Sequence, residues 1–465
     1  MKPQHPDMLS RLSAFLLLIS FSVMVGACAT WYQKNSKFNQ AFESGSIQQA
    51  NQLLQNKEKE AEGKDRLLYF LDRGVVLQML GEYEESNAYF EKAYLYLQDF
   101  RKSYGFAVLS MISNPMVRPY PGEDHEKVLI HYYKALNYLM LNDPQSALVE
   151  ARRINNQLNE FNTKYEDHPN RYKTDAWAHT IMGIAYDIEK DVNNAFIAYR
   201  NAYYAYRNIY EDHFGTQIPE QLKYDLLRTA AANGFWDELR KFETEFGINR
   251  ESYAQPNPEL IFFWHNGLGP VKEEWSINFT LVKGDGGVIL FENTELGLSF
   301  PFPIYDSDIY DEDEFSDLRM VRVAFPKYAL ERAHYQGAAL VFDSTDTYPL
   351  EISENVYQIA RSVLQDRLLR EMSTALLRLA AKQASEAAIR EQNEDLGTVI
   401  SIINAATEKA DTRNWQTLPH SISYARIPLD TGEYHYQLKS GDAVHGSFNV
   451  DLSPGETEIQ LFHSL

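Results

Sequence analysis

The sequence contains very little cysteine, since Cys28 is the only one among 465 residues. A single thiol cannot form an intramolecular disulfide, which excludes a disulfide-stapled fold. Basic residues are also scarce, because 44 lysines and arginines stand against 65 aspartates and glutamates, a net charge of −21. A surface this acidic repels nucleic acid and anionic lipid headgroups, so neither is an expected ligand.

Catalytic signatures are missing as well. The sequence has no H-E-x-x-H, no G-x-S-x-G and no Walker loop. Its histidines are scattered: His179 falls at a packing position of a helical repeat, and His265 ends a strand-like run. The most acidic stretch, 305–317, lacks the central glycine of an EF-hand and is either a solvated loop or a loose divalent-ion site. We therefore predict no enzyme activity, no cofactor and no metal centre.

Long apolar runs are absent after residue 28, but one precedes it. Lys2 and Arg11 give a positive start, and residues 14–27 carry no charge and end in small residues, as in a secretory signal peptide. Fourteen residues are too few for a span that needs about 20. The sequence Val25-Gly26-Ala27-Cys28 resembles the bacterial lipobox, which implies attachment of diacylglycerol to the thiol of Cys28, cleavage before it and acylation of the new amine. An ordinary cleaved signal or an uncleaved anchor are the alternatives.

The residue after the cysteine bears on location. Aspartate there holds lipoproteins at the inner membrane of well-studied Gram-negative bacteria, whereas residue 29 is alanine. The lipobox resemblance therefore implies an outer-membrane protein anchored by lipid and facing the periplasm. We expect everything after Cys28 to be globular and on one side of the membrane.

The first half carries a helical repeat. Residues 67–100 resemble a 34-residue tetratricopeptide (TPR) unit, in which small residues let paired helices approach and large ones fill the seam between them. The signature positions are Phe70, Gly74, Tyr83, Ser86, Phe90 and Ala93 in this unit, and Gly183, Ala195, Tyr199 and Ala202 in a later one. Weaker units bring the prediction to four or five stacked hairpins between 31 and 247. An unrelated helical bundle is the alternative.

The second half changes period. Short runs rich in β-branched and aromatic residues alternate with turn residues and predict strands near 259–265, 276–282, 287–291, 319–325 and 338–343. One long helical stretch follows at 354–392, either packed against another helix or membrane-active, and the tail 421–465 reads as antiparallel strands.

The predicted fold class is α+β, with an N-terminal TPR-like α-solenoid followed by a mixed β-rich domain that has one long inserted helix. The predicted divisions are a signal peptide at 1–27, the repeat domain at 28–250, a β-rich domain at 255–350, a helical segment at 351–410 and an antiparallel β unit at 411–465.

Two stretches, 264–275 and 406–426, mix Asn, Gly, Asp, Arg and Trp with turn residues. Asn266 and Gly267 belong to the first, and Asp411, Arg413 and Trp415 to the second. The second stretch is either a hydrogen-bonded knot, with Arg413 bridging carboxylates and Trp415 filling a core, or a partner site.

With its lipobox, its repeat "LDRGVVLQMLGEYEESNAYFEKA" and the motifs "NGLGPVKEE" and "ATEKADTRNWQTLP", the chain resembles a family of bacterial TPR-containing lipoproteins. The resemblance covers most of the chain after Cys28 and implies a role in the cell envelope, but no particular activity. We predict a scaffold whose curved array binds protein partners, with the oligomeric state open. The alternatives are a subunit of a secretion or surface-assembly complex and a hydrolase of envelope glycan or peptide.

Overall fold

The computed structural model describes residues 30–102, 118–164, 171–249, 258–284, 288–295, 297–303, 319–328, 332, 334–342, 346–368, 372, 376 and 409–465. Cys28, the predicted signal peptide and the acidic stretch 305–317 lie outside these residues. The predicted helix at 354–392 is helical over 356–368 and at 372 and 376, and its remaining part also lies outside them.

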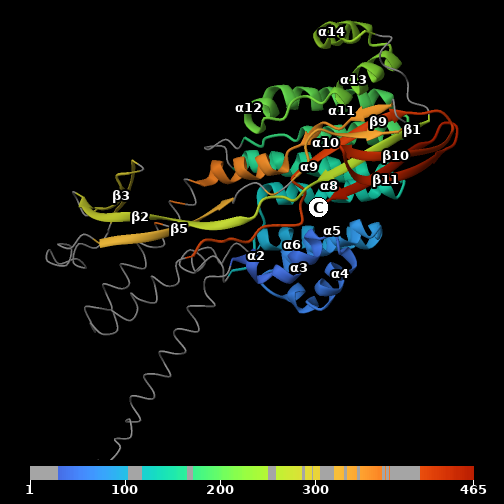
Figure 1. The fold of residues 1–465 in the computed structure, drawn as a ribbon. Helices are drawn as coiled ribbons and strands as arrows, with labels where there is room; N and C mark the ends of the chain where they lie inside the picture. Colours follow the sequence, from blue (N-terminus) through green and yellow to red (C-terminus); the bar gives the residue numbers. More distant parts are fainter. Residues whose placement is uncertain are drawn as a thin grey trace, which may run out of the picture.

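The N-terminal half of the described chain is a stack of five helical hairpins (Figure 1). Their first helices are α3 (Ser36–Glu43), α5 (Arg66–Met79), α8 (Asp124–Met140), α10 (Ala176–Ile188) and α13 (Glu220–Asn233). Their second helices are α4 (Ile47–Gln55), α6 (Tyr83–Lys102), α9 (Pro144–Lys164), α11 (Val192–Ala205) and α14 (Trp236–Phe246). The predicted number and span of the hairpins are confirmed.

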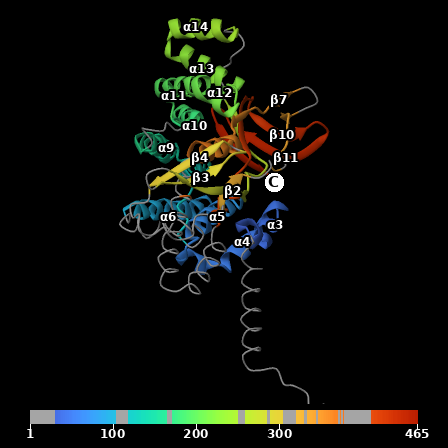
Figure 2. The same ribbon diagram turned by 90° about the vertical axis from the view of Figure 1, so that its left-hand side faces the viewer.

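Shorter helices complete this half. They are α2 (Trp31–Lys34) before the first hairpin, the 3-10 helix η1 (Glu58–Glu62), and the π-helix η4 (Tyr206–Tyr210) with α12 (Glu211–Phe214) after α11. The hairpins at the two ends of the array, α3–α4 and α13–α14, lie far apart in both views (Figures 1 and 2).

In two of the hairpins a small residue faces a large one across the helix pair. A Cβ on Gly74 of α5 would lie 2.6 Å from the ring of Phe90 in α6, so only glycine lets that ring pack there. Gly183 of α10 faces the ring of Tyr199 in α11 in the same way. The turn glycine Gly81 has a φ of +79°, a conformation that glycine adopts without strain.

The C-terminal half contributes three four-stranded sheets. The first has the order β12-β1-β9-β8, the second β11-β10-β6-β7 and the third β4-β3-β2-β5. The strands are β1 (Glu259–Asn266), β2 (Lys272–Gly284), β3 (Val288–Asn293), β4 (Leu298–Pro303), β5 (Arg319–Tyr328), β6 (Ala338–Val341), β7 (Thr347–Pro349), β8 (Ile352–Glu354), β9 (Ser421–Pro428), β10 (Gly432–Ser440), β11 (Ala443–Leu452) and β12 (Thr457–Ser464).

Strand β1 explains how the layers are stacked. All eight of its residues are buried, as expected for a strand covered on both faces. Ile261 and Phe263 join the core of the helical array, whereas Leu260 and Phe262 join a second core shared with β6, β10 and β11. The first sheet is therefore the middle of three layers, between the helices and the second sheet.

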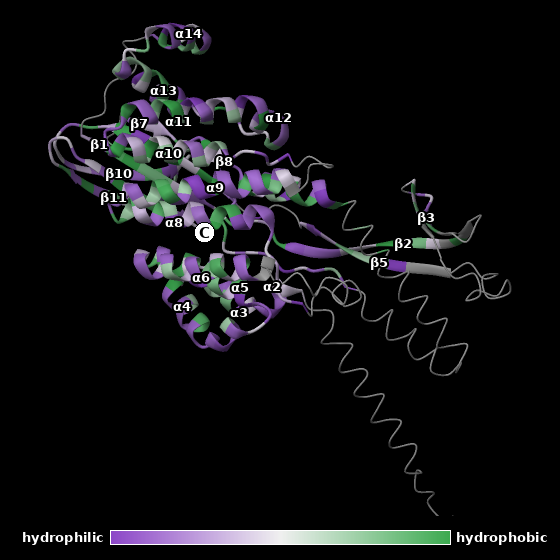
Figure 3. Ribbon diagram, turned by 180° about the vertical axis from the view of Figure 1, so that it is seen from behind, coloured by the Kyte–Doolittle hydropathy of each residue, from purple (hydrophilic) through white to green (hydrophobic). Residues whose placement is uncertain are grey.

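The third sheet extends away from the other two (Figures 1 and 3). Its buried face, with Ile277, Phe279 and Val323, packs on Leu368, Met372 and Leu376 of the helix that follows β8. Along the array, hydrophilic and hydrophobic residues alternate on the helices, as amphipathic helices require (Figure 3).

The tail differs from its predicted arrangement. We expected 421–465 to close the chain as an antiparallel unit, but β12 runs parallel to β1 and β10 pairs with β6. The reason is that β1, hydrophobic on both faces, needs a neighbour on each edge, and the tail supplies β9 and β12. The domain boundaries remain a prediction. The first and second sheets each contain strands from more than one of the predicted divisions.

Candidate functional site

The candidate site is the face of the array formed by its first helices, where TPR-like arrays are suited to bind an extended peptide. The chain itself covers this face. Asn39 of α3 donates to Gln416 at 3.2 Å, Asp72 of α5 accepts from Thr417 at 2.9 Å, and Asp225 of α13 accepts from Tyr424 at 2.7 Å. All of these contacts come from the segment 409–424, more than 190 residues further along the chain.

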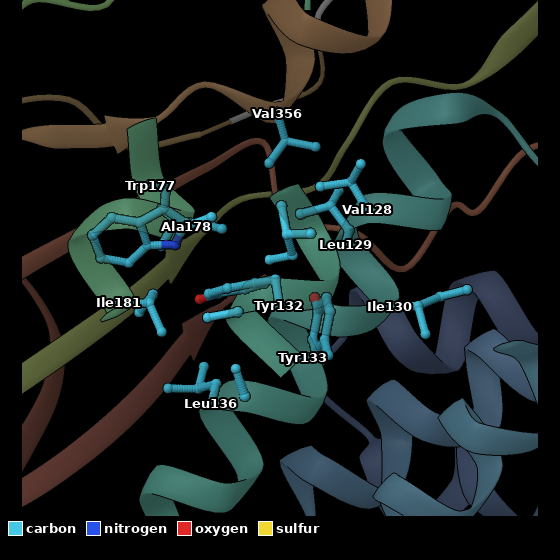
Figure 4. Close-up of a cluster of buried hydrophobic side chains, with 14 of the residues drawn as sticks. Val128, Leu129, Ile130, Tyr132, Tyr133, Leu136, Trp177, Ala178, Ile181 and Val356 are labelled. Atoms are coloured by element: carbon cyan, nitrogen blue, oxygen red, sulfur yellow. The ribbon is translucent and has the colours of Figure 1, made fainter. Parts of the chain in front are cut away.

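Aromatic and aliphatic packing completes the cover over α8 and α10. The ring of Trp177 lies 6.0 Å from that of Phe263 and 5.3 Å from that of Tyr424, centroid to centroid. Val356, at the start of the helix after β8, packs among the side chains of α8 (Figure 4). The strands and the segment 409–424 therefore occupy the face on which TPR-like arrays are suited to bind a partner.

Trp415 is the anchor of that segment. It is 1% exposed, and its ring lies 5.3 Å from Tyr133 and 5.9 Å from Phe90. Its backbone N–H donates to Glu126 at 2.6 Å, and its indole N–H donates to Thr417 at 2.8 Å. An aromatic anchor with its backbone held by side chains is also how a groove holds a peptide ligand.

Arg413 lies beside it at the centre of a polar knot. Its guanidinium donates to both oxygens of Asp411 at 2.7 and 2.9 Å, to Asp65 at 2.8 Å and to the carbonyl of Arg118 at 2.8 Å. Burial lowers the pKa of Arg413, but the two carboxylates outweigh it and raise that pKa overall. This geometry is that of the structural alternative, in which Arg413 bridges carboxylates and Trp415 fills a core.

The two unusual stretches of the sequence meet here. Asn414 accepts from the backbone N–H of Lys272 at 3.2 Å and donates to the carbonyl of Pro270 at 2.8 Å. Gly269 donates to the carbonyl of Leu418 at 2.7 Å. The motifs "NGLGPVKEE" and "ATEKADTRNWQTLP" therefore pack against each other, which their distance in the sequence gave no reason to expect.

Asn266 and Gly267 lie at the end of β1. The amide of Asn266 donates to the carbonyl of Tyr335 at 2.8 Å and accepts from its N–H at 3.0 Å, as a neighbouring strand would. Gly267 has a φ of +63° and donates to the carbonyl of Ser464 at 2.8 Å. Both residues lie where β1 ends, at one end of an inner strand of the first sheet.

A buried ionic network joins the sheet to α10 and α13. Arg426 of β9 donates to both oxygens of Glu259 in β1 at 2.6 and 2.7 Å, and to Asp187 of α10 at 3.2 Å. Its Nε lies 3.0 Å from Asp225, and Arg228 also pairs with Asp187 and Asp225. Burial raises the pKa of Asp187, but the two arginines outweigh it and lower that pKa overall.

Tyr199, a signature residue of the repeat, also takes part in this network. Tyr199 fills the α10–α11 seam, and its hydroxyl donates to Asp187 at 2.8 Å and accepts from Arg426 at 3.1 Å. Sequence reasoning placed Tyr199 in the seam but missed Arg426, Glu259 and Asp187. The only sequence feature that could have pointed to these three residues is that each is a charged residue within a mostly apolar run.

A second charged cluster lies near the start of α8. The carboxylate of Glu123 pairs with Lys272, 2% exposed at its side chain, and with Arg367 at 2.6 Å. Burial raises the pKa of Glu123, but these cations outweigh it and hold that pKa well below its usual range. Burial lowers the pKa of neighbouring His125 to about 4.

The histidines and acids that could suggest chemistry are buried. His265 contacts the hydroxyl of Tyr132 at 2.7 Å and His463 at 3.3 Å, and burial lowers the pKa of both imidazoles. Burial and mutual repulsion raise the pKa of Glu354, and burial raises that of Asp175, which caps α10. Neither pair is open to a substrate from solvent.

Metal and membrane features can be assessed for the same residues. Within the described ranges, His, Cys, Asp and Glu nowhere gather in the groups of three that would hold a metal ion. Among the helices of that part of the chain, none combines the length and the hydropathy needed to cross a bilayer.

The second helices present a different surface. Seven large hydrophobic side chains are exposed in the described residues, and four of them lie on second helices. They are Leu95 on α6, Val149 on α9, Ile197 on α11 and Trp236 on α14, with exposures between 37% and 51%. Val149 and Ile197 occupy the same position of successive TPR-like units, so their side chains face outward for the same reason.

Comparisons with known proteins were made for the whole chain. No protein-family model and no curated protein sequence matches it. Part of the chain is similar to the solved structure of MamA residues 41-end from Desulfovibrio magneticus RS-1, at 14% identity, with 47% of this chain and 95% of that chain covered and a TM-score of 0.29.

Two other solved structures are similar over the same fraction. They are the apo form of RapI (16% identity, 46% of this chain, 52% of that chain, TM-score 0.34) and nearly identical TPR-like repeats from a kinesin light chain of Podosopora anserina (13%, 48%, 95%, 0.30). The TPR-like description of this chain rests on its own hairpins.

Proposed function

We propose that this chain is a lipid-anchored protein of the bacterial outer membrane that faces the periplasm and acts as a protein-interaction scaffold without enzymatic activity. The lipobox supports the anchor, and the TPR-like array supports the scaffold. Cys28 would carry the lipid, and the folded part of the chain would bind the protein partner.

The difference between the covered first helices and the exposed second helices supports the scaffold proposal and indicates which surface binds the partner. The first-helix face is filled by Trp415, Tyr424 and β1, whereas exposed apolar side chains lie on the second helices of four hairpins. Removing exposed apolar side chains from water favours association with a partner. The partner therefore binds the second helices, centred on Val149 and Ile197.

Photo-cross-linking in intact cells tests this surface. A photoreactive residue at Val149 or Ile197 should give discrete adducts with an envelope protein, while the same residue at Val444, which is 50% exposed on β11, should not. Adducts with a second copy of the chain would favour the assembly-subunit alternative. Adducts at Val444 alone would place the partner on the sheets and contradict the proposal.

The anchor has its own test. Mass spectrometry of the envelope protein should show an N-terminal Cys28 that carries acyl chains, and a salt wash should not release the protein. Three acyl chains bind a bilayer far more tightly than one, which holds only marginally. An unmodified thiol in salt-released material would contradict the anchor.

A hydrolase is less well supported by the geometry. It needs two carboxyl groups that a glycan or peptide can reach, whereas the neighbouring acids Asp175 and Glu354 are buried beside Tyr172 and Tyr210. Incubation of the purified chain with muropeptides should leave them intact.

A further inference from the structure

The start of the folded chain lies very close to the predicted lipid. Thr30 caps α2 with its hydroxyl and its backbone, and the N–H of Trp31 donates to the hydroxyl of Thr412 at 3.3 Å. Trp31, three residues after Cys28, is therefore fixed to the segment that crosses the first helices. Three residues of chain span about 10 Å at most, so a lipid on Cys28 would be attached close to Trp31.

The surface at this point has an unusual charge. No acidic residue occurs between Cys28 and Glu43, although the chain as a whole is strongly acidic. Lys34 and Lys37 are exposed on α2 and α3, and the amine of Lys57 donates to Asn35 between them at 2.6 Å. We call the group Trp31, Tyr32, Lys34, Lys37 and Lys57 the α2–α3 corner.

Two of the nearby acids, Glu43 and Glu60, are paired. Glu43 accepts from the hydroxyl of Tyr32 at 2.9 Å and pairs with Arg332 at 2.5 Å. Glu60 lies 3.6 Å from the amine of Lys57, so this lysine is the one partly neutralised. Lys34 and Lys37 thus face solvent as positive charges, beside two half-buried aromatic rings of the kind enriched at membrane interfaces.

We propose that the α2–α3 corner rests on the bilayer and that Lys34 and Lys37 contact the phosphates of anionic phospholipids. The inference rests on the proposed lipid anchor and adds the orientation of the body. Lysines near an anionic surface add to the hold of an acyl chain, a second signal beside the lipid itself. The array then stands with α3–α4 at the membrane and α13–α14 away from it, as their places at opposite ends allow (Figure 2).

Fluorescence quenching can test this on the acylated full-length chain. Because diacylglycerol would block the thiol of Cys28, a cysteine introduced at Gln40 on α3 or at Thr244 on α14 is the only free thiol and can carry a fluorophore. The protein is reconstituted in vesicles of phosphatidylglycerol and phosphatidylcholine with a nitroxide on the lipid headgroup. We expect strong quenching at position 40 and little at position 244.

Charge reversal supplies the matched comparison. The pair Lys34→Glu and Lys37→Glu should abolish most of the quenching at position 40, because losing one lysine near an anionic surface weakens binding by about fivefold. The control pair, Lys173→Glu and Lys190→Glu, lies on either side of α10 and changes the net charge by the same amount as the first pair. It should leave the quenching at position 40 unchanged. Vesicles of phosphatidylcholine alone should mimic the first pair.

The outcomes separate the two proposals. Acylated protein with equal quenching at positions 40 and 244, or quenching that survives Lys34→Glu and Lys37→Glu, would overturn the lipid contact and leave the anchor in place. An unmodified Cys28 in the mass spectrum of the same sample would remove the anchor and the orientation together.

Discussion

The two faces of the helical array differ in what covers them. The first helices are buried beneath strands and the segment 409–424, with Trp415 at 1% exposure, whereas the second helices leave Trp236 at 46% exposure. Both faces belong to the same TPR-like repeats. The difference teaches that a repeat array predicts a binding face but does not say whether its ligand comes from another chain or from the same one.

The covered face also differs in chemistry. Glu259, Asp187 and Asp225 are buried there around Arg426 and Arg228, while ion pairs on the outer face, such as Arg240 with Asp237, stand in solvent. A buried charge is costly unless it is paired, whereas an exposed pair contributes about 0–1 kcal/mol. Substitutions on the two faces should therefore have very different effects.

Arg426→Ala should have the largest effect. It leaves the carboxylates of Glu259, Asp187 and Asp225 buried with one arginine, and breaking a buried ion pair costs about 3–5 kcal/mol. Urea denaturation followed by circular dichroism measures the loss. Arg240→Ala on α14 is the control and should stay within about 0.5 kcal/mol. Equal effects of the two changes would contradict the contrast between the faces.

Trp415→Ala comes next. Removing a buried tryptophan costs about 3–5 kcal/mol, because it leaves a cavity between Phe90 and Tyr133. Trp236→Ala, on the exposed face, should change the free energy of unfolding by less than about 1 kcal/mol. If Trp415→Ala unfolds like the parent chain but loses its cross-linked partner, the residue is a docking site and the structural interpretation fails.

Gly74→Ala should have an intermediate effect, since it acts on the seam between the faces. The new methyl group would lie 2.6 Å from the ring of Phe90, and overpacking of this kind costs about 1–3 kcal/mol. At Gly63 the nearest atom to an added Cβ is 3.5 Å away, an ordinary contact. A thermal melt should therefore show a lower midpoint for Gly74→Ala than for Gly63→Ala.

Asp72→Asn comes last because its effect should appear as a change of stability with pH. Burial raises the pKa of Asp72 from 3.8 to about 7, so the folded chain keeps a proton that the unfolded chain releases near pH 4. In the wild type, the contribution of the Asp72 carboxyl to the free energy of unfolding therefore falls as the pH rises from about 4 through 7. The variant lacks this loss, so its stability relative to wild type should improve over that window in urea titrations.

The control for that experiment is Asp237→Asn, at an exposed carboxyl with no comparable burial. Relative to wild type, Asp72→Asn should gain more stability over this pH window than the control does. Equal behaviour of the two variants would mean that the carboxyl of Asp72 is ionised in the folded chain.

Much of the array could be predicted because its contacts are local. Gly74 and Phe90, or Gly183 and Tyr199, are sixteen residues apart and pack across one turn, so their spacing is visible in the sequence. The strands β1, β2, β3, β5 and β6 were located from their composition, but β4, β7 and β8 were not. The last two are three residues long, too short to show a period.

The sequence by itself determined the helical hairpins, the α+β class and the approximate place of the strands, because each depends on side chains within a few turns of one another. Only the tertiary structure decided that β12 lies parallel to β1, that Arg426 gathers three carboxylates, and that the chain covers its own first-helix face. These features join residues far apart in the sequence, such as Arg426 and Glu259, which are 167 positions apart. Their geometry follows from how the layers pack, which no local pattern encodes.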